Sequence, residues 1–543
     1  MEAGVSYSIE RLDHLGIVAG VCREIGLSEW LDSRAGESER KVSVGTATVA
    51  MVLNGLGFSN RQLYLIPQFF QNKPVEQLLG EGIKAEDLND DCLGRTLDWI
   101  YENDATKLFA GIARRAREVF GIGSEQIHVD TTSFSVSGEY KGTDEAAIEV
   151  AYGYSRDHRA DLKQWMLSLA TTQDGDVPLF MRSLDGNSSD KVSLVEAVTA
   201  LQEQLCAEEE GPCIYVADSG LYSETNMRRL GEAKVSWVAR VPETSTEAKR
   251  IIDPDAQDWQ TTADGQTRWY TRLVGLPQGK ERWVVVSTAP GEKRAKETME
   301  RKLEREREKW EKALWHLGNR EFACEADARA ALAQCVRKLP AWFEVSSTMT
   351  SSPRYAKSGR PGKDATPKSV VWQAQAKLGV DREGVERGWR RRACFIVGTN
   401  VLDASVLPDE DVARIYKEQG SVERGFSFLK DPLFLASSVF VKKPSRIVAL
   451  GFIMVLCLLV YRLAEHRLRS RLVETKQTVP NQVGKQTARP TMRWVFQLFE
   501  GIDLLRIGSP ADTTLHVLRL QPVHKQILSL LGQPYQKIYN LPA

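Results

Sequence analysis

The segment IYKEQGSVERGFSFLK, residues 415–430, constrains the fold more than any other part of the chain. Offsets of three, seven and fourteen residues, at about 100° per residue, put four polar side chains on one stripe of a helix: Tyr416, Gln419, Glu423 and Lys430. Apolar residues form a neighbouring stripe, namely Val412, Ile415, Val422, Phe426 and Leu429. We therefore predict a helix that carries a carboxylate, an ammonium and a phenol along the edge of a buried face. An ordinary amphipathic helix is the alternative for this segment taken alone.

Two segments upstream each place an aspartate in a strand. QIHVDTTSFSVSG predicts a strand with Asp130 near its middle, and CIYVADSGLYS predicts a short strand that ends at Asp218 and a Ser-Gly turn. With Glu423 they make three carboxylates, which repel one another unless divalent cations neutralise them. Two Mg²⁺ ions suit such a set, because Mg²⁺ takes oxygen ligands and can clamp the attacking and leaving oxygens of a phosphodiester. Each aspartate taken singly is also compatible with an ordinary turn or strand-end residue.

The pattern over residues 119–243 predicts an α/β core. Three strand-like segments are followed by a helix, a strand, a helix and another strand, which is the order of an RNase H-like fold. Asp130 then lies on the first strand and Asp218 at the end of the fourth. Glu423 belongs to a later helix that packs against this sheet. The 204 residues between Asp218 and Glu423 are far more than one crossover needs, so we predict an insertion.

The remaining chain divides around this core. Residues 1–118 predict a helical N-terminal domain, with packing or oligomerisation as the alternative to a binding role. Residues 244–395 form the insertion, with β-rich edges and a long charged helix over Gly291–Arg320. The second part of the core spans residues 396–470, and residues 471–543 form a C-terminal segment. The apolar run Ile447–Tyr461 is too short for a membrane span and predicts a buried helix that packs on the predicted sheet.

Composition sets wide limits. A chain of 543 residues holds three or four domains, and its net charge of zero excludes only a uniformly basic coat. Residues 441–493 contain eleven Lys or Arg and two Glu, which fits either a phosphate-neutralising surface or a solvated face. The eight cysteines form no CxxC motif, so reduced cytosolic thiols are expected and a structural zinc site is not. The N-terminal residues lack the pattern of a signal peptide, and we expect a cytoplasmic protein without a membrane anchor.

At these motifs the chain resembles the DDE transposases of bacterial insertion sequences. Within them it is similar to the group numbered sixteen thirty-four, formerly placed in group four, whose helix signature is Tyr-x2-Arg-x3-Glu-x6-Lys. The segments that carry the resemblance are VDTT, VADSGLYS, YGYSRDHRADLKQ (Tyr152 to Gln164), DGNSSDK (Asp185 to Lys191), the region from Ile9 to Phe120, and the helix of residues 415–430. There are two departures, because Gln419 replaces the Arg of the signature and Ala160 replaces a Pro.

The resemblance implies DNA strand cleavage and transfer. Asp130, Asp218 and Glu423 would hold two Mg²⁺ ions, for which Mn²⁺ can substitute, and the partners would be the terminal inverted repeats and target DNA. Tyr416, Gln419 and Lys430 would face the DNA, with the cation of the signature missing at Gln419. His128 could approach the site, although a packing histidine is the favoured interpretation. Action on two DNA ends implies a homodimer on DNA, and the helical N-terminal domain would bind the element's ends.

One loop of the insertion adds a further candidate. Residues 355–368 contain Ser-Gly-Arg-Pro, which partly resembles a hook whose Arg enters a narrow minor groove. This makes Arg360 a candidate DNA-binding residue, with a plain flexible loop as the alternative. Two other functions remain open at this point. One is an RNase H-like nuclease that cuts DNA without strand transfer, and the other is a catalytically silent DNA-binding protein descended from a transposase.

Overall fold

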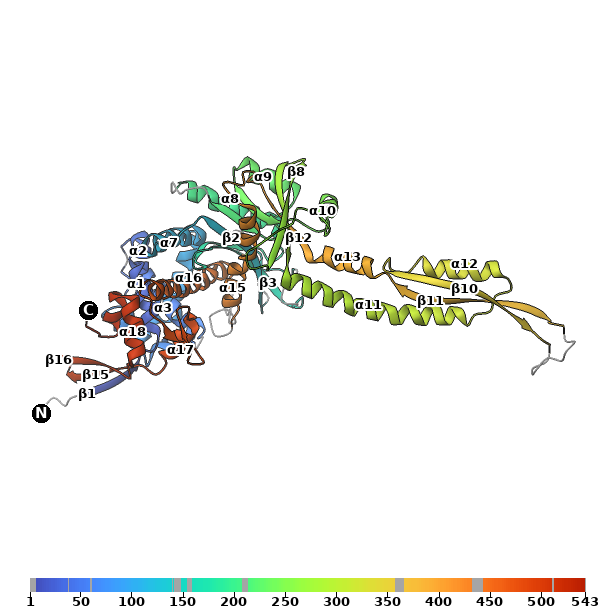
Figure 1. Cartoon of the computed structure of the whole chain (residues 1–543). Helices are drawn as coiled ribbons and strands as arrows, with labels where there is room; N and C mark the ends of the chain where they lie inside the picture. Colours follow the sequence, from blue (N-terminus) through green and yellow to red (C-terminus); the bar gives the residue numbers. More distant parts are fainter. Residues whose placement is uncertain are drawn as a thin grey trace.

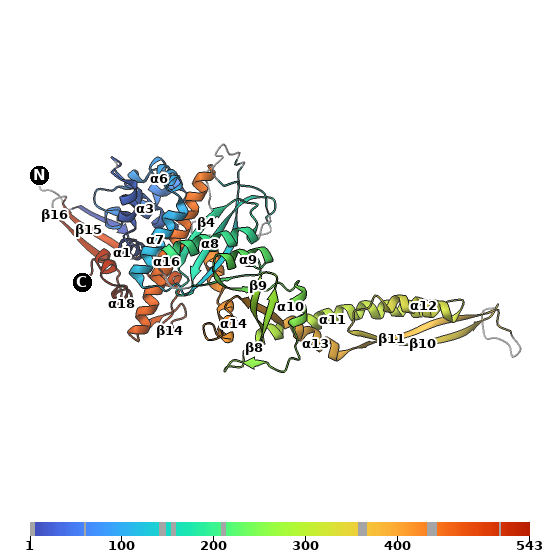
Figure 2. The same ribbon diagram turned by 90° about the horizontal axis from the view of Figure 1, so that it is seen from above.

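The computed structural model describes residues 6–37, 39–58, 61–138, 140, 148–153, 159–207, 213–356, 366–431, 443–509 and 512–542. These residues form a compact body and a long arm that projects from it (Figure 1). The body contains a helical region built from both ends of the chain and a large mixed sheet. Figure 2 shows the same arrangement from above, with the helix α16 (Pro444–Glu474) lying between the helical region and the sheet.

The N-terminal region is helical, as predicted. It begins with the strand β1 (Ser6–Arg11) and continues through α1 (Leu15–Glu24), α2 (Leu27–Ala35), α3 (Val44–Leu56), η1 (Leu63–Leu65), α4 (Ile66–Phe70), α5 (Val75–Leu79), η2 (Ala85–Leu88), α6 (Asp90–Glu102) and α7 (Ala105–Phe120). The Ser43 hydroxyl caps α3 by accepting a hydrogen bond from the Thr46 amide. Twelve of the thirteen residues of α3 are buried, which makes this helix the centre of the region.

The sheet starts with the order of elements that the sequence predicts. The chain runs through β2 (Gln126–Val136), β3 (Lys163–Thr172), β4 (Pro178–Leu184), α8 (Asp190–Ala207), β5 (Ile214–Ala217), α9 (Glu224–Glu232) and β6 (Ser236–Arg240). Strands β2, β3 and β4 pair antiparallel, whereas β2, β5 and β6 pair parallel. Hydrophobic side chains alternate between the two faces of β2, so that Ile127 and Val129 pack under α8 and α9.

Four further strands extend this sheet to nine, in the order β4-β3-β2-β5-β6-β12-β9-β8-β7. They are β7 (Gln260–Thr261), β8 (Thr267–Leu276), β9 (Gly279–Thr288) and β12 (Cys394–Thr399), and α10 (Thr246–Ile251) packs beside them. The β-rich edges of the predicted insertion therefore belong to the same sheet as Asp130. A domain boundary placed at residue 243 would cut through this sheet.

The arm is the part of the insertion that leaves the sheet. It consists of α11 (Ala289–Gly318), α12 (Glu325–Val336), the paired strands β10 (Phe343–Arg354) and β11 (Ser369–Val380), and α13 (Arg382–Ala393). Helix α11 is the long charged helix that the sequence predicts over Gly291–Arg320. The arm has its own small hydrophobic cluster, in which Leu314, Phe322 and Ala374 are buried.

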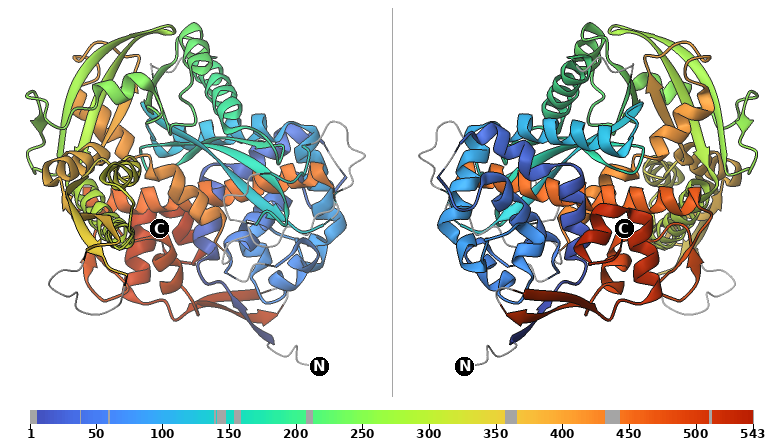
Figure 3. Two further views of the ribbon diagram at one scale, coloured as in Figure 1. Left: turned by 90° about the vertical axis from the view of Figure 1, so that its right-hand side faces the viewer. Right: turned by 90° about the vertical axis from the view of Figure 1, so that its left-hand side faces the viewer.

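The second face of the sheet is covered by α14 (Asp409–Lys417), α15 (Gly420–Leu429) and α16. The rest of the chain returns to the N-terminal helices, as Figure 3 shows for the red and blue elements. It forms β13 (Val479–Pro480), β14 (Gln486–Thr487), α17 (Met492–Leu498), β15 (Asp503–Ser509), β16 (Asp512–Leu518), α18 (Pro522–Leu531) and α19 (Gln533–Ile538). Strand β1 pairs with β15, and α19 packs on α1, so both chain ends share one core with α16.

Helix α16 contains the apolar run Ile447–Tyr461 and is twice as long as that run. Among the described residues it is the one helix with the length and composition to cross a membrane, and 94% of its most apolar window is buried within the chain. Its neighbours are α1, α3, α6, α7, α15, α17, α18 and β4. The predicted burial of this segment against the sheet is confirmed, and the helical region covers its other side.

Candidate functional site

The two predicted aspartates lie next to each other in the sheet. Strands β2 and β5 are parallel neighbours, and the last registered pair is His128 with Val216. Asp130 lies two residues further along β2, and Asp218 is the first residue after β5. Continuing the register places both at the same level and on the same face of adjacent strands, which lie about 4.8 Å apart. Asp130 Oδ1 accepts a hydrogen bond from the Thr131 amide, and Asp218 Oδ1 accepts one from the Gly220 amide, both at 2.7 Å.

The third carboxylate is carried over the same face by α15. Leu169 on β3 pairs with Asp130, so its side chain points to the same side of the sheet. A Cβ placed on Gly425 of α15 would stand 3.2 Å from Leu169 Cδ2 and 3.3 Å from Leu458 Cδ2 of α16. Helix α15 is therefore wedged between the sheet and α16. Glu423 lies two residues before Gly425, about 200° around the helix, and Tyr416 is within electrostatic reach of both Glu423 and Asp218. Glu423 is exposed and, within the described residues, forms no hydrogen bond or ion pair.

The prediction of a single helix over residues 415–430 is wrong. Helix α14 ends at Lys417, Glu418 and Gln419 form a turn, and α15 begins at Gly420. The turn coincides with Gly420, a poor helix former, and with contacts of the Glu418 side chain to Gln173 and Arg414. As a result α14 packs against β5, β6, β8, β9 and β12, whereas α15 packs against β2 and β3. The four polar residues thus come from two helices and the turn between them.

Tyr416 and Arg240 complete the surroundings of the carboxylates. Strand β6 is the parallel neighbour of β5, and continuing their register places Arg240 beside Asp218. Arg240 hydrogen-bonds to Tyr416, whose phenol lies within electrostatic reach of both Asp218 and Glu423. Burial raises the pKa of Tyr416, the Arg240 cation and hydrogen bond oppose that rise, and the two carboxylates reinforce it. Arg240 also stacks over Phe395 at 5.3 Å and pairs with Glu243 at 2.6 Å.

Arg240 is a residue that the sequence analysis missed. The only sequence signal is its place at the end of the apolar strand segment VSWVAR. That segment says nothing about which strand lies beside it. The position of Arg240 next to Asp218 follows from strand pairing, which has no local signature.

The other candidate DNA-facing residues are more scattered. Gln419 is half-buried at the N-terminal cap of α15. Lys430 caps the opposite end, with its ammonium 5.7 Å from the centre of the Phe134 ring. Arg360 lies outside the described residues, as do residues 154–158 of the YGYSRDHRADLKQ segment.

His128 is fully buried on β2, on the same face as Asp130. Neither ring nitrogen has a hydrogen-bond partner among the described residues. Burial lowers the pKa of His128 to about 4, so the ring is neutral at physiological pH. The favoured packing role fits its burial, although its hydrogen-bonding groups are not satisfied.

The basic run of residues 441–493 is largely committed to ion pairs inside the chain. Its arginines pair as follows: Arg446 with Asp98, Arg467 with Glu24, Arg462 and Arg469 with Glu465, Arg471 with Glu474, and Arg493 with Asp431. These pairs join α16 to α6, to α1 and to the segments around α15 and α17. The positive charge of this run therefore acts mainly within the fold.

The donor set at the sheet fits divalent cations by its chemistry, since all three candidate ligands are carboxylates. Within the described part of the chain, however, no three Asp, Glu, His or Cys side chains lie close enough together to hold a metal ion. Asp130 and Asp218 are neighbours by strand pairing, while Glu423 approaches from a helix above them. The backbone thus brings the three carboxylates to one face without closing them into a ligand cage.

The chain is similar to two family models and to a solved structure. The family model described as a transposase DDE domain matches residues 123–460, and residues 7–114 match a family described as a domain of unknown function, DUF4277. No curated protein matches the chain. A cryo-EM structure of the piggyBac transposase synaptic complex with hairpin DNA aligns with 91% of this chain and 82% of that one, at 10% identity and a TM-score of 0.36. Because the DDE model spans more than half of the 543 residues, the chain belongs to the family of transposases with a DDE domain.

Proposed function

We propose that this DDE transposase serves a bacterial insertion sequence of the group numbered sixteen thirty-four, cutting DNA at the element's ends and joining those ends to target DNA. One observation carries the proposal: Asp130 and Asp218 start from the same level of adjacent parallel strands, and the helix of Glu423 crosses the same face. The strand order around them supports an RNase H-like core. The spacing of Tyr416, Glu423 and Lys430 supports the group assignment.

Asp130, Asp218 and Glu423 are the proposed ligands of two Mg²⁺ ions, for which Mn²⁺ can substitute. When bound, such ions polarise the phosphate and lower the pKa of the attacking hydroxyl. The protein's part is to present the three carboxylates on one face. The Thr131 and Gly220 amides fix one oxygen of each aspartate by a hydrogen bond, which orients the carboxylate planes.

Contacts to DNA phosphates are proposed for Tyr416, Lys430 and Arg240. Arg240 lies beside Asp218 and hydrogen-bonds to Tyr416, so its guanidinium is the cation proposed to contact a phosphate next to the carboxylates. Gln419 contributes an amide in place of a cation. Arg360 is proposed to reach DNA from the arm. The helical N-terminal region is proposed to bind the element's ends, and the active form is proposed to be a homodimer on DNA in the cytoplasm.

A catalytically silent DNA-binding protein is the less favoured alternative, because Asp130, Asp218 and Glu423 are all present and α15, which carries Glu423, packs on β2 and β3. A nuclease without strand transfer is also less favoured, because a minimal nuclease needs neither the helical region nor the arm. The proposal and the two alternatives differ in whether the protein cuts DNA and in whether it joins the cut ends to target DNA.

The test uses a supercoiled plasmid that carries the genomic DNA flanking the gene, incubated with the full-length protein and Mg²⁺ or Mn²⁺. We expect the wild type to nick the plasmid at the element's ends and to join those ends to a second plasmid. Asp218→Ala should abolish nicking while binding of an end-containing duplex is retained. Glu297→Ala, which removes an exposed carboxylate from α11, is the matched control and should behave as wild type.

Each result decides between the alternatives. Nicking by Asp218→Ala would show that the proposed metal site is wrong. A wild type that binds the ends and never cuts would favour the silent DNA-binding protein. A wild type that cuts without joining would favour the nuclease.

A further inference from the structure

The helix that carries Glu423 is held by ion pairs on both sides. At its N-terminal half, Arg424 makes a two-pronged contact with Asp176, with both N–O distances at 2.9 Å. Just beyond its C-terminal end, Asp431 pairs with Arg493 of α17 at 2.9 Å. Asp176 lies in the turn between β3 and β4, so the first contact ties α15 to the edge of the sheet. The second ties it to the C-terminal segment.

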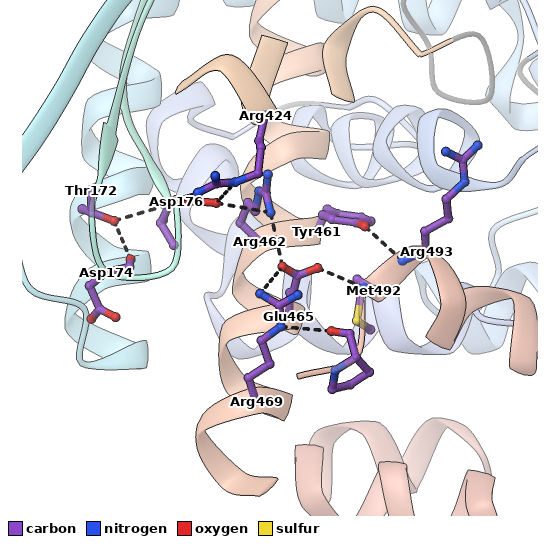
Figure 4. Close-up of polar contacts among 12 residues, drawn as sticks. Thr172, Asp174, Asp176, Arg424, Tyr461, Arg462, Glu465, Arg469, Met492 and Arg493 are labelled. Atoms are coloured by element: carbon purple, nitrogen blue, oxygen red, sulfur yellow. Dashed lines mark hydrogen bonds and ion pairs between the residues drawn. The ribbon is translucent and has the colours of Figure 1, made fainter. Parts of the chain in front are cut away.

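The contact of Arg424 with Asp176 belongs to a connected set of polar residues, which Figure 4 shows in close-up. Arg493 joins this set through its amide, which donates a hydrogen bond to the Tyr461 hydroxyl. Asp176 also faces Arg462 of α16 at 3.6 Å, and Arg462 pairs with Glu465 at 3.2 Å. Glu465 in turn pairs with Arg469 at 2.7 Å and accepts a hydrogen bond from the Met492 amide at the start of α17. The set thus links the β3–β4 turn, α15, α16 and α17.

The inner members of the set are shielded from water. The side chains of Asp176, Arg462 and Glu465 are 14%, 8% and 6% exposed, respectively. Ion pairs at such sites are screened much less than surface pairs, and removing one partner leaves a charge without its compensation. Bidentate guanidinium–carboxylate pairs also fix relative orientation, which a single contact does not.

The balance of charges in this set indicates that it holds α15 in position and does not bind an anion. A cavity of about 450 Å³ is lined by Arg424, Arg462, Arg469 and Arg493. Its lining also contains Asp176, Asp431 and Glu465, and each of the four guanidiniums pairs with one of these carboxylates. An anion entering the cavity would have to displace a carboxylate that already occupies the guanidinium.

The backbone of Asp176 adds a second observation. Its φ is +56°, in the left-handed region that non-glycine residues rarely adopt, at a cost of about 1 kcal/mol or more. Asp is among the few residues that tolerate this conformation. The turn therefore holds a mildly unfavourable backbone conformation at the residue whose carboxylate meets both Arg424 and Arg462.

From these contacts we propose that Asp176 is a positioning residue for the reaction, which acts through Arg424 to set where Glu423 stands above Asp130 and Asp218. Arg424 follows Glu423 directly in the chain, so a shift of the guanidinium moves the neighbouring carboxylate with the helix. Asp431 and Arg493 perform the same task at the other end of α15. This inference rests on the proposed role of Glu423.

Asp176→Asn is the decisive variant, because Asn also tolerates the left-handed conformation and has nearly the same shape. Arg424→Gln removes the other partner. Arg228→Gln is the control, since Arg228 forms an exposed ion pair with Glu224 at 2.8 Å on α9, on the opposite face of the sheet. All variants are compared in full-length protein by plasmid nicking, by affinity for an end-containing duplex without metal, and by hydrogen–deuterium exchange of the peptide covering residues 420–430.

We expect Asp176→Asn and Arg424→Gln each to slow nicking by about tenfold to a hundredfold, the range for a displacement of about 1 Å near reacting groups. Duplex affinity should stay within about twofold, and exchange should speed up in residues 420–430 because local opening becomes easier. The double variant should be no slower than the slower single variant, because both remove the same contact.

Three results would overturn the inference. The first is wild-type nicking and wild-type exchange in Asp176→Asn. The second is a loss of duplex affinity as large as the loss of rate, which would make Arg424 a DNA contact. The third is additive effects in the double variant. If the wild type never nicks DNA, the proposed function fails, and the exchange measurement still shows whether Asp176 holds α15.

Discussion

Gly425 offers the most direct test of how α15 is seated. This glycine lies in the middle of a ten-residue helix, where it lowers helix stability, yet it is the point at which α15 meets both the sheet and α16. A Cβ at this position would stand 3.2 Å from Leu169 and 3.3 Å from Leu458. Normal carbon contacts are about 3.5–4.0 Å. The two leucine methyl groups would therefore have to yield by a few tenths of an ångström for alanine and by much more for a larger side chain.

Alanine and leucine at position 425 should have different effects on stability and on nicking. Gly425→Ala gains about 1 kcal/mol in helix propensity, which offsets the cost of a small displacement of two flexible side chains. We expect its stability and nicking rate to remain close to wild type. Gly425→Leu adds three further carbons to a filled interface, at a cost of about 1–3 kcal/mol from overpacking. Since the methyl groups cannot retreat that far, α15 should move away from the sheet and take Glu423 with it.

The assay compares three quantities for both variants: plasmid nicking in a single turnover, affinity for an end-containing duplex, and the midpoint of thermal unfolding. For Gly425→Leu we expect nicking to fall by about a hundredfold, as for other displacements near 1 Å at reacting groups, with affinity changed far less. The alanine variant controls for the loss of backbone freedom. If Gly425→Leu nicks DNA within about twofold of wild type, α15 does not set the position of Glu423 and the geometric argument is refuted.

Three further outcomes follow from the structure. Glu423→Gln keeps the shape of the side chain and should abolish Mg²⁺-dependent nicking with duplex affinity retained; residual nicking near the wild-type rate would exclude Glu423 as a ligand. Burial raises the pKa of Cys22 to about 12, so at pH 8 a thiol reagent should label exposed Cys324 in the native protein and Cys22 only after denaturation; rapid native labelling of Cys22 would contradict its burial. A fragment of residues 1–118 should fail to fold, because α1, α3, α6 and α7 bury their apolar faces against α16 and α19; a cooperative thermal transition in that fragment would contradict this interdependence.

Sequence patterns were sufficient to predict the order of strands and helices in the core, because each of these elements has a local signature. The alternation in QIHVDTTSFSVSG and the short apolar run before Asp218 mark strands, and the order of strands and helices limits the possible topologies. The same holds for α11, whose alternating charges over many turns are typical of an exposed helix. The strands β8, β9 and β12 were also visible, but their membership of the central sheet was not, since pairing depends on partners far away in the chain.

The break between α14 and α15 shows the opposite case. The polar residues from Tyr416 to Lys430 fit one helix by periodicity, and only Gly420 hints at an end. What decides the break is tertiary packing: Val412 and Ile415 pack against Val216 and Val238, while Gly425 is held between Leu169 and Leu458. The periodicity correctly identified this segment as helical, but it predicted one helix where tertiary packing produces two.

The three carboxylates depend on the fold in different ways, and this explains why the third was hardest to place. The hydrogen-bond register of β2 and β5 fixes Asp130 and Asp218, which needs only the sheet. Glu423 is fixed by α15, which rests on α16, and α16 is in turn the central wall of a helical core built from both chain ends. Residues hundreds of positions away in the sequence therefore affect the position of Glu423, and they hardly affect the positions of Asp130 and Asp218. For this reason changes in the terminal regions should act on the reaction through Glu423 first, with the aspartate pair left in place.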